Sequence, residues 1–196
     1  MPDKPIYGLI LAGGESRRMG RDKALLLRDG KSQLEYVAAL LTATVDQVFV
    51  SVRKEQHGEP ERSRFNTIAD RYDGIGPVAG ILSAMDEYPD ADWLVVACDL
   101  PNIDAATLGY LLEKRSDEQP FTAFRSSHNQ LPEPLCAVYC ADSHTIVREF
   151  VADGLVCPRK MLIRSDTCLL EQPDPHALDN INTPDDLAGS VLEATS

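Results

Sequence analysis

The sequence predicts a Rossmann-like α/β fold of three layers, in which a mostly parallel central sheet lies between two layers of helices. Two observations predict it. Short apolar runs alternate with helix-length amphipathic segments over most of the chain, and this alternation is typical of βαβ units in a parallel sheet. The first run, residues 6–12, is apolar almost throughout, which indicates a strand that is buried on both faces.

Each element is predicted from its own pattern. We expect strands at residues 6–12, 47–52, 65–69, 93–98, 121–125 and 134–139, and helices at residues 77–88, 107–114 and 143–152. A further helix opens at Ser32, because Ser32 and Glu35 have the spacing of a capping box and apolar residues follow at helical spacing. Residues 183–186 have the pattern of a capped helix start with proline at its first position.

The composition excludes several classes of function. The 196 residues are 43% hydrophobic, enough for a proper core, and without a repeat or linker they predict one domain over residues 1–196. A net charge of -12 would repel nucleic acid and anionic membranes. No apolar run approaches the roughly 20 residues of a membrane span, and the first residues leave no room for a signal peptide. We therefore expect a cytoplasmic protein with no nucleic-acid or membrane partner.

The cysteines predict neither a disulfide framework nor a metal site. Their number is five, and an odd count in a chain with a good core argues against paired thiols. Cys136 and Cys140 have the spacing of a C-x-x-x-C metal pair. Alternation along an apolar strand also puts both thiols on one side, and we favour this interpretation as core cysteines over metal ligands.

A glycine-rich basic segment follows the first strand, at residues 11–23. Its glycines let the backbone approach a ligand closely and turn N–H groups toward phosphate oxygens. Four positive charges follow in this acidic protein, on Arg17, Arg18, Arg21 and Lys23. The segment matches neither the P-loop nor the G-x-G-x-x-G fingerprint. It predicts a polyphosphate site, the alternative being a surface turn with solvated arginines.

The segment L-A-G-G-E-S-R-R-M-G-R-D-K resembles the signature of nucleotidyltransferases, most closely that of the molybdenum cofactor guanylyltransferase family. The Gly13-Gly14 pair favours the guanylyl branch over cytidylyltransferases, which usually read L-A-A-G. The resemblance implies that this loop binds the nucleotide. Lys23 and Arg17 would act on the triphosphate, and the residues that would contact the nucleotide through this loop are Leu11, Ala12, Gly13 and Gly14.

Asp99 follows the most apolar strand, within the motif C-D-L-P. A carboxylate that meets a phosphate site at the end of a central strand suits Mg²⁺, which prefers one or two carboxylates together with substrate phosphates. The alternative is that Asp99 caps the next helix, but Asp104 and Thr107 already supply capping chemistry there. In the family that the chain resembles, this aspartate is the magnesium ligand.

Asp70 ends a short predicted strand, and Gly76-Pro77 begins the next helix. The small residues Ala79 and Gly80 permit close approach by a planar group, or equally by a neighbouring backbone in tight helix packing. The resemblance places Asp70 at a nucleotide-binding position. A carboxylate there can pair with the N1–H and the exocyclic amine of guanine.

Two segments near the C-terminus are candidates for binding the acceptor. Alternation along a short predicted strand, residues 179–182, puts Asn180 and Asn182 on one face, and the family carries N-x-N-T-P at this place, near the metal and the acceptor. Arg159 and Lys160 would meet an acceptor phosphate, or else belong to a solvated helix start. Glu133 stands where the family pattern has a histidine.

Together these motifs imply magnesium-dependent transfer of GMP from GTP to the phosphate of molybdopterin, with release of pyrophosphate. The resemblance also implies contact with proteins of molybdenum cofactor biosynthesis or molybdoenzyme maturation. One alternative is a related nucleotidyltransferase that uses CTP with molybdopterin, or a sugar phosphate acceptor. Another is a non-catalytic nucleotide-binding partner, which would not need Lys23 and Asp99. The four histidines have no metal-ligand spacing, and we assign them no role.

Overall fold

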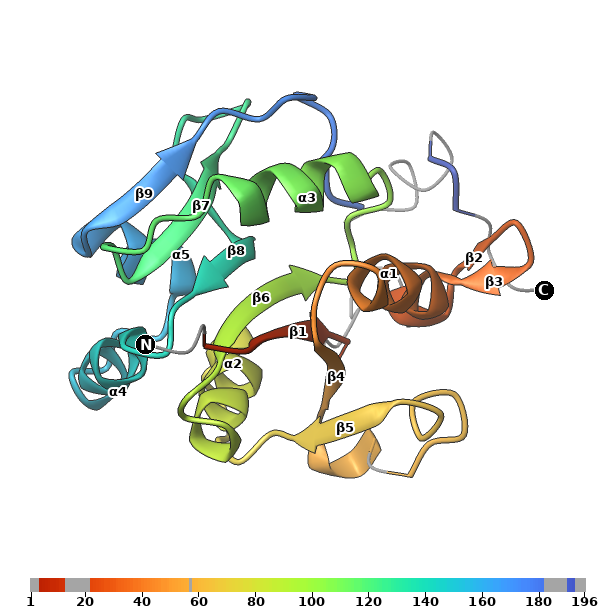
Figure 1. Cartoon of the computed structure of the whole chain (residues 1–196). Helices are drawn as coiled ribbons and strands as arrows, with labels where there is room; N and C mark the ends of the chain where they lie inside the picture. The colour runs from red at the N-terminus through yellow and green to blue at the C-terminus, as the bar shows by residue number, and fades with distance from the viewer. Residues whose placement is uncertain (1–3, 13–21, 57, 182–189, 193–196) are drawn as a thin grey trace.

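The computed structural model describes residues 4–12, 22–56, 58–181 and 190–192. A seven-stranded sheet with the order β5-β4-β1-β6-β8-β7-β9 forms its centre (Figure 1). The strands are β1 (Ile6–Leu11), β4 (Gln47–Val52), β5 (Asn66–Ala69), β6 (Asp92–Ala97), β7 (Phe121–Arg125), β8 (Pro132–Tyr139) and β9 (Thr167–Leu170). All neighbours are parallel except β8, which runs antiparallel to β6 and β7. The mostly parallel sheet is therefore confirmed.

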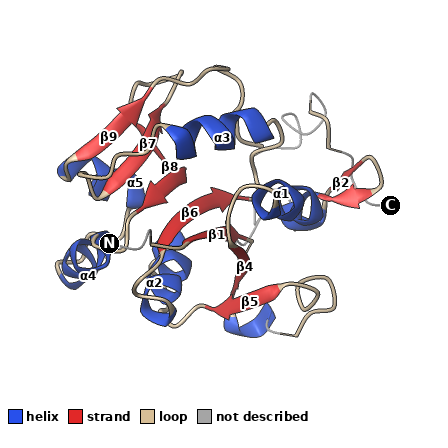
Figure 2. Cartoon of the chain, in the orientation of Figure 1, coloured by secondary structure: helices blue, strands red, loops and turns tan. Residues whose placement is uncertain are grey.

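Helices cover both faces of this sheet (Figure 2). They are α1 (Gln33–Thr42), α2 (Pro77–Glu87), α3 (Ala105–Glu113), α4 (Ser143–Ala152) and α5 (Pro158–Arg164). The buried side chains of α1 and α3 belong to one core cluster, and those of α2, α4 and α5 belong to a second. Since each cluster also takes side chains from the strands, the three-layer α/β/α architecture is confirmed.

The capping box that opens α1 is also confirmed. The N–H of Glu35 donates to Ser32 Oγ at 3.2 Å, and the N–H of Ser32 donates to Glu35 Oε2 at 2.9 Å. The predicted boundaries of β4, β7 and α4 are exact, and those of the other helices and strands predicted within residues 6–139 move by at most two residues. For example, α3 begins at Ala105 because Asp104 caps it.

Several short elements were not predicted from the sequence, among them the hairpin β2 (Leu27–Arg28) and β3 (Lys31–Ser32) and strand β9. Helix α5 corresponds to the alternative of a helix start at Arg159 and Lys160, although its length was not predicted. The hairpin turns at Asp29 and Gly30, which both have positive φ. Two-residue Asp-Gly turns between antiparallel strands require this backbone conformation. Each of these elements is short, so hydrophobic periodicity gives little signal for it.

The interpretation of the cysteines as core residues holds. Cys136 lies in the core cluster under α1 and α3, and Cys140 packs against the same cluster. All five thiols are free. Burial raises the pKa of Cys136 to about 12, so this thiol stays protonated and unreactive at neutral pH.

Within the described part of the chain, no helix combines the length and the apolar character that crossing a membrane would require.

Candidate active site

The candidate site lies where the carboxyl ends of β1 and β6 meet. The chain passes from β1 to β4 on one side, whereas after β6 it continues to strands on the other side. Such a divergence opens a crevice beyond the ends of the strands, and ligands of α/β sheets bind there. Leu11 and Ala97 are register partners, and the N–H of Cys98 donates to the carbonyl of Leu11 at 3.4 Å. The segments after β1 and β6 therefore leave the sheet side by side.

Lys23 and Asp99 come together at this point. Lys23 begins a short 3-10 helix, η1 (Lys23–Leu25), which Asp22 caps: the N–H of Ala24 donates to Asp22 Oδ1 at 3.0 Å. The Nζ of Lys23 lies 3.4 Å from Asp99 Oδ2, and the two side chains are 18% and 26% exposed. A cation and a carboxylate that are partly open to solvent can receive a phosphate and a divalent cation between them.

Asp99 is not the cap of the following helix. That role belongs to Asp104, which accepts the N–H of Thr107 at 2.8 Å. Among the described residues, no cluster of three or more His, Cys, Asp or Glu side chains can hold a metal ion. A site with one carboxylate still fits Mg²⁺, which takes its remaining oxygen ligands from water and substrate phosphates.

Asp70 lies directly after β5, at the same edge of the sheet. Its N–H donates to the carbonyl of Val52 at 2.8 Å, and Ser51 Oγ donates to Asp70 Oδ1 at 2.8 Å. Burial raises the pKa of Asp70 above its usual value, although the hydrogen bond from Ser51 acts in the opposite direction. Further hydrogen-bond donors stabilise a desolvated carboxylate of this kind more than they stabilise an exposed one.

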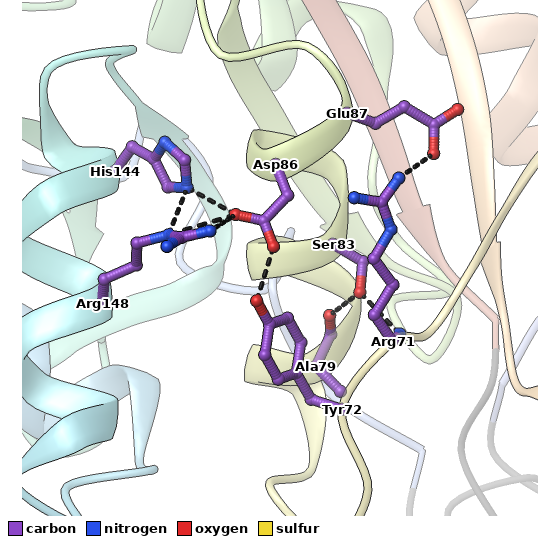
Figure 3. A network of polar contacts seen from close by, with 8 residues as sticks. All are labelled: Arg71, Tyr72, Ala79, Ser83, Asp86, Glu87, His144 and Arg148. Carbon is purple, nitrogen blue, oxygen red and sulfur yellow. Dashed lines mark hydrogen bonds and ion pairs between the residues drawn. The ribbon is translucent and has the colours of Figure 1, made fainter.

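The two residues after Asp70 are fixed against α2 (Figure 3). The N–H of Arg71 donates to Ser83 Oγ at 2.8 Å, and the hydroxyl of Tyr72 donates to Asp86 Oδ2 at 2.5 Å. His144 and Arg148 of α4 contact the other oxygen of Asp86 at 2.7 and 2.6 Å. This network joins α2, α4 and the loop that begins at Asp70.

The start of α2 also packs closely against the sheet. A Cβ on Gly80 would lie 2.2 Å from Ser51 Oγ and 3.0 Å from Leu11 Cδ2. Of the two interpretations of the small residues Ala79 and Gly80, tight packing of the helix therefore explains Gly80. Gly76, the N-cap of α2, has φ 60° and ψ -141°, a backbone conformation that essentially only glycine adopts.

Gly80→Ala is expected to lower the free energy of unfolding by about 1–3 kcal/mol, because the added methyl must displace Ser51 or the backbone of β4. Gly109→Ala in α3 is the matched control. Nothing lies within 4 Å of its added Cβ, so it should stabilise the helix by about 0.5–1 kcal/mol. Urea unfolding measures both, and a Gly80→Ala variant as stable as the wild type would contradict the close packing.

A small pocket of about 70 Å³ opens beside Asp99. Its polar lining consists of Asp99, Glu133, Arg159 and Asn180. Arg159 Nη2 donates to Glu133 Oε2 at 2.9 Å, and its Nε donates to the carbonyl of Pro132 at 3.0 Å. The structure therefore brings Arg159 and Asn180 close to Asp99, the candidate ligand of Mg²⁺. Lys160 is exposed on α5 and does not line the pocket.

The predicted strand at residues 179–182 is wrong for its described part, since residues 179–181 form no strand. The N–H of Ile181 donates to the carbonyl of Asp99, two residues after β6, at 3.1 Å. Because Asp99 lies beyond the end of β6, this bond does not extend into the regular series of hydrogen bonds that pairs two strands. The carboxylate oxygens of Asp179 instead contact His128 Nε2 at 2.8 Å and His176 Nδ1 at 2.9 Å. The sequence had predicted no role for these two histidines.

Several sequence-predicted residues lie outside the described part of the chain. They are Gly13, Gly14, Arg17, Arg18, Arg21, Asn182 and the helix start at residues 183–186. One described residue was missed altogether: Arg62 is buried between Ala12 and Asp22. Its surroundings in the sequence, residues 53–65, are mostly polar, so no hydrophobic pattern distinguishes this arginine from a solvated one.

This fold, with a cation and a carboxylate at its topological switch point, fits a nucleotidyltransferase. Residues 8–167 match the model of the MobA-like NTP transferase domain, and the chain belongs to this family. The resemblance seen in the sequence is therefore confirmed.

Individual relatives of the chain have names that are consistent with this family. The chain is 35% identical to the molybdenum cofactor biosynthesis bifunctional protein of Synechocystis sp. over 182 residues. The matched region covers 93% of this chain and 52% of that protein. The chain thus spans about half the length of that relative. It is 32% identical over 194 residues to a probable molybdenum cofactor guanylyltransferase of Pelotomaculum thermopropionicum, with 95% and 92% covered.

A solved structure is also similar. Molybdopterin-guanine dinucleotide biosynthesis protein A from Archaeoglobus fulgidus superposes with a TM-score of 0.77 at 25% identity, over 93% of this chain and 95% of that chain.

Proposed function

We propose that this chain is a molybdenum cofactor guanylyltransferase, which transfers GMP from GTP to the terminal phosphate of molybdopterin and releases pyrophosphate. The observation that carries this proposal is the meeting of Lys23 and Asp99, 3.4 Å apart, at the switch point of the sheet. The names of the relatives support the choice of nucleotide and acceptor. We place the reaction in the cytoplasm, in one domain over residues 1–196.

In the proposed reaction, an oxygen of the acceptor phosphate attacks the α-phosphorus of GTP. The bond from that phosphorus to the bridging oxygen of the β-phosphate breaks, and pyrophosphate leaves with the electron pair. A phosphate nucleophile is already ionised at neutral pH, so no general base is needed. The task of the protein is therefore alignment and neutralisation of charge.

Lys23 and Arg17 would offset the charge of the triphosphate as pyrophosphate departs, and Asp99 would hold Mg²⁺. When bound, Mg²⁺ supplies positive charge to the phosphate oxygens. The backbone of Leu11, Ala12, Gly13 and Gly14 would contact the nucleotide. These roles agree with the position of Leu11 beside Ala97 at the ends of β1 and β6.

Asp70 would recognise the guanine base. Its carboxylate is already desolvated and accepts one hydrogen bond from Ser51, so it keeps acceptor sites for the N1–H and the amine of guanine. Cytosine offers no equivalent pair of adjacent donors.

The acceptor would bind on the other side of Asp99, in the pocket that Arg159 and Asn180 line. A guanidinium has five N–H donors, more than its contacts to Pro132 and Glu133 use. Arg159 would therefore bind the acceptor phosphate without leaving Glu133. Asn182 would assist, and the exposed Lys160 would contribute only as a more distant charge.

The experiment that tests the proposal incubates the protein with each of the four NTPs, Mg²⁺ and molybdopterin, and analyses the dinucleotide products. We expect product from GTP, and GTP binding at least about tenfold tighter than CTP binding, a difference of about 1.4 kcal/mol. Equal affinities in a calorimetric titration would sink the guanylyl assignment and favour the CTP alternative. GTP binding without any product would favour the non-catalytic alternative.

Arg159→Ala is expected to raise the KM for the acceptor by about 10-fold or more, because a charge-assisted hydrogen bond to phosphate is lost. The KM for GTP should stay nearly unchanged. Lys160→Ala should have a smaller effect in the same direction. Arg164→Ala, on the exposed end of the same helix, is the control with no effect. An unchanged acceptor KM in Arg159→Ala would reduce Arg159 to a structural link between α5 and β8.

A further inference from the structure

We propose that Arg62 is a positioning residue that holds Asp22 against the carbonyl of Ala12 and so sets Lys23 against Asp99. This inference rests on the proposed function, because it assumes that Lys23 binds the phosphates of a nucleoside triphosphate. Nothing in the motifs of the sequence points to Arg62.

The guanidinium of Arg62 is almost completely buried, with 1% of the residue exposed. Its Nη2 donates to the carbonyl of Ala12 at 3.0 Å and to Asp22 Oδ2 at 2.5 Å, and its Nη1 pairs with Glu59. A buried charge is costly unless it is paired and hydrogen-bonded. The fold therefore keeps this charge at a place where it has specific partners.

Two of these three partners, Ala12 and Asp22, flank residues 13–21. Because one nitrogen contacts both oxygens, the carbonyl oxygen of Ala12 and Oδ2 of Asp22 are no more than about 5.5 Å apart, the sum of the two distances. Arg62 thus holds the chain at the end of β1 close to the residue that caps η1. The planar guanidinium, with its fixed donor directions, holds that separation better than a flexible ammonium would.

Asp22 then transmits this constraint to Lys23. While Oδ2 is held by Arg62, Oδ1 caps the N–H of Ala24 at 3.0 Å. That cap fixes the first turn of η1, which begins with Lys23. The side chain of Lys23 reaches Asp99 from this turn. Arg62 therefore acts on the site through Asp22, without contacting Asp99 itself.

Glu59 provides the control that separates positioning from mere folding. It is the third partner of Arg62 but does not flank residues 13–21. Its side chain is 43% exposed, so Glu59→Gln should be tolerated. Asp22→Asn keeps the shape and can still cap η1, but it loses the charge that faces Arg62. Arg62→Lys keeps the charge but not the fork of donors.

The test measures the dissociation constants of GTP and GMP by calorimetry, and the melting temperature, for these three variants and for the double variant Asp22→Asn/Arg62→Lys. We expect Asp22→Asn and Arg62→Lys each to weaken GTP binding by about tenfold or more. The double variant should be no weaker than the poorer single variant, because both break one linkage. GMP binding should change less than about twofold, since GMP lacks the β- and γ-phosphates, and Glu59→Gln should bind GTP as the wild type does.

Three results would overturn the inference. They are unchanged GTP affinity in Asp22→Asn and Arg62→Lys, equal losses for GTP and GMP, and a loss in Glu59→Gln as large as theirs. If Arg62→Lys does not fold, Asp22→Asn against Glu59→Gln still decides. Failure of the wild type to bind GTP would instead refute the proposed function, so the two failures are distinguishable.

Discussion

Asp99→Asn is expected to lower turnover by at least about 100-fold, because the substitution keeps the shape of the side chain but removes the charge that would bind Mg²⁺. The melting temperature should change little. Asp99 does not cap α3, and it stands partly exposed opposite Lys23, so no buried network depends on its charge. Steady-state turnover at saturating GTP and Mg²⁺, together with thermal unfolding, measures both effects.

Asp104→Ala is the control for Asp99→Asn. It removes the hydrogen bond to the N–H of Thr107 and should cost about 1 kcal/mol of stability as a lost helix cap, with turnover unchanged. If Asp99→Asn kept full turnover, the metal role of Asp99 would be wrong. If Asp104→Ala instead abolished turnover, the start of α3 would belong to the site.

Lys23→Ala should weaken GTP binding by about 10- to 150-fold, since a charge-assisted contact to phosphate is worth roughly 1.5–3 kcal/mol. Transfer should slow as well, because the same charge is needed while pyrophosphate leaves. Calorimetric titration with GTP measures the first effect and single-turnover kinetics the second. Binding of free Mg²⁺ should not weaken, because removal of Lys23 leaves Asp99 without the cation that now lies 3.4 Å away.

Lys31→Ala is the matched control for Lys23→Ala. Lys31 is exposed on β3, close in sequence to Lys23 but at the hairpin. It should leave GTP affinity within about twofold of the wild type, as is usual for an exposed charge outside the site. Wild-type GTP affinity in Lys23→Ala would show that the triphosphate is held elsewhere.

The comparison of sequence and structure is clearest for α1 and α5. The start of α1 was predicted because Ser32 and Glu35 form a capping box within four consecutive residues. Helix α5 has only seven residues, and its N-cap Cys157 makes no side-chain capping bond. It is stabilised by packing against β8 and by the bond from Arg159 to Glu133. Neither of these contacts leaves a local pattern.

Several residues of the candidate site could be predicted from the sequence, but their contacts could not. Local motifs of a few residues indicate Lys23, Asp70 and Asp99 as candidates. The relations between them could not be predicted. Lys23 and Asp99 are 76 positions apart, and Arg62 lies 50 positions from the carbonyl of Ala12 that it binds.

The sequence by itself thus determined the alternation of strands and helices, the capped start of α1 and the chemical type of the nominated side chains. Periodicity, capping and motif spacing are local properties, and they persist whatever the arrangement of the elements. The tertiary structure alone decided that β1 lies between β4 and β6, and this strand order brings Lys23 to Asp99. It also decided that burial makes Arg62 a link between Ala12 and Asp22 rather than a solvated loop residue, because desolvation depends on segments that are distant in sequence.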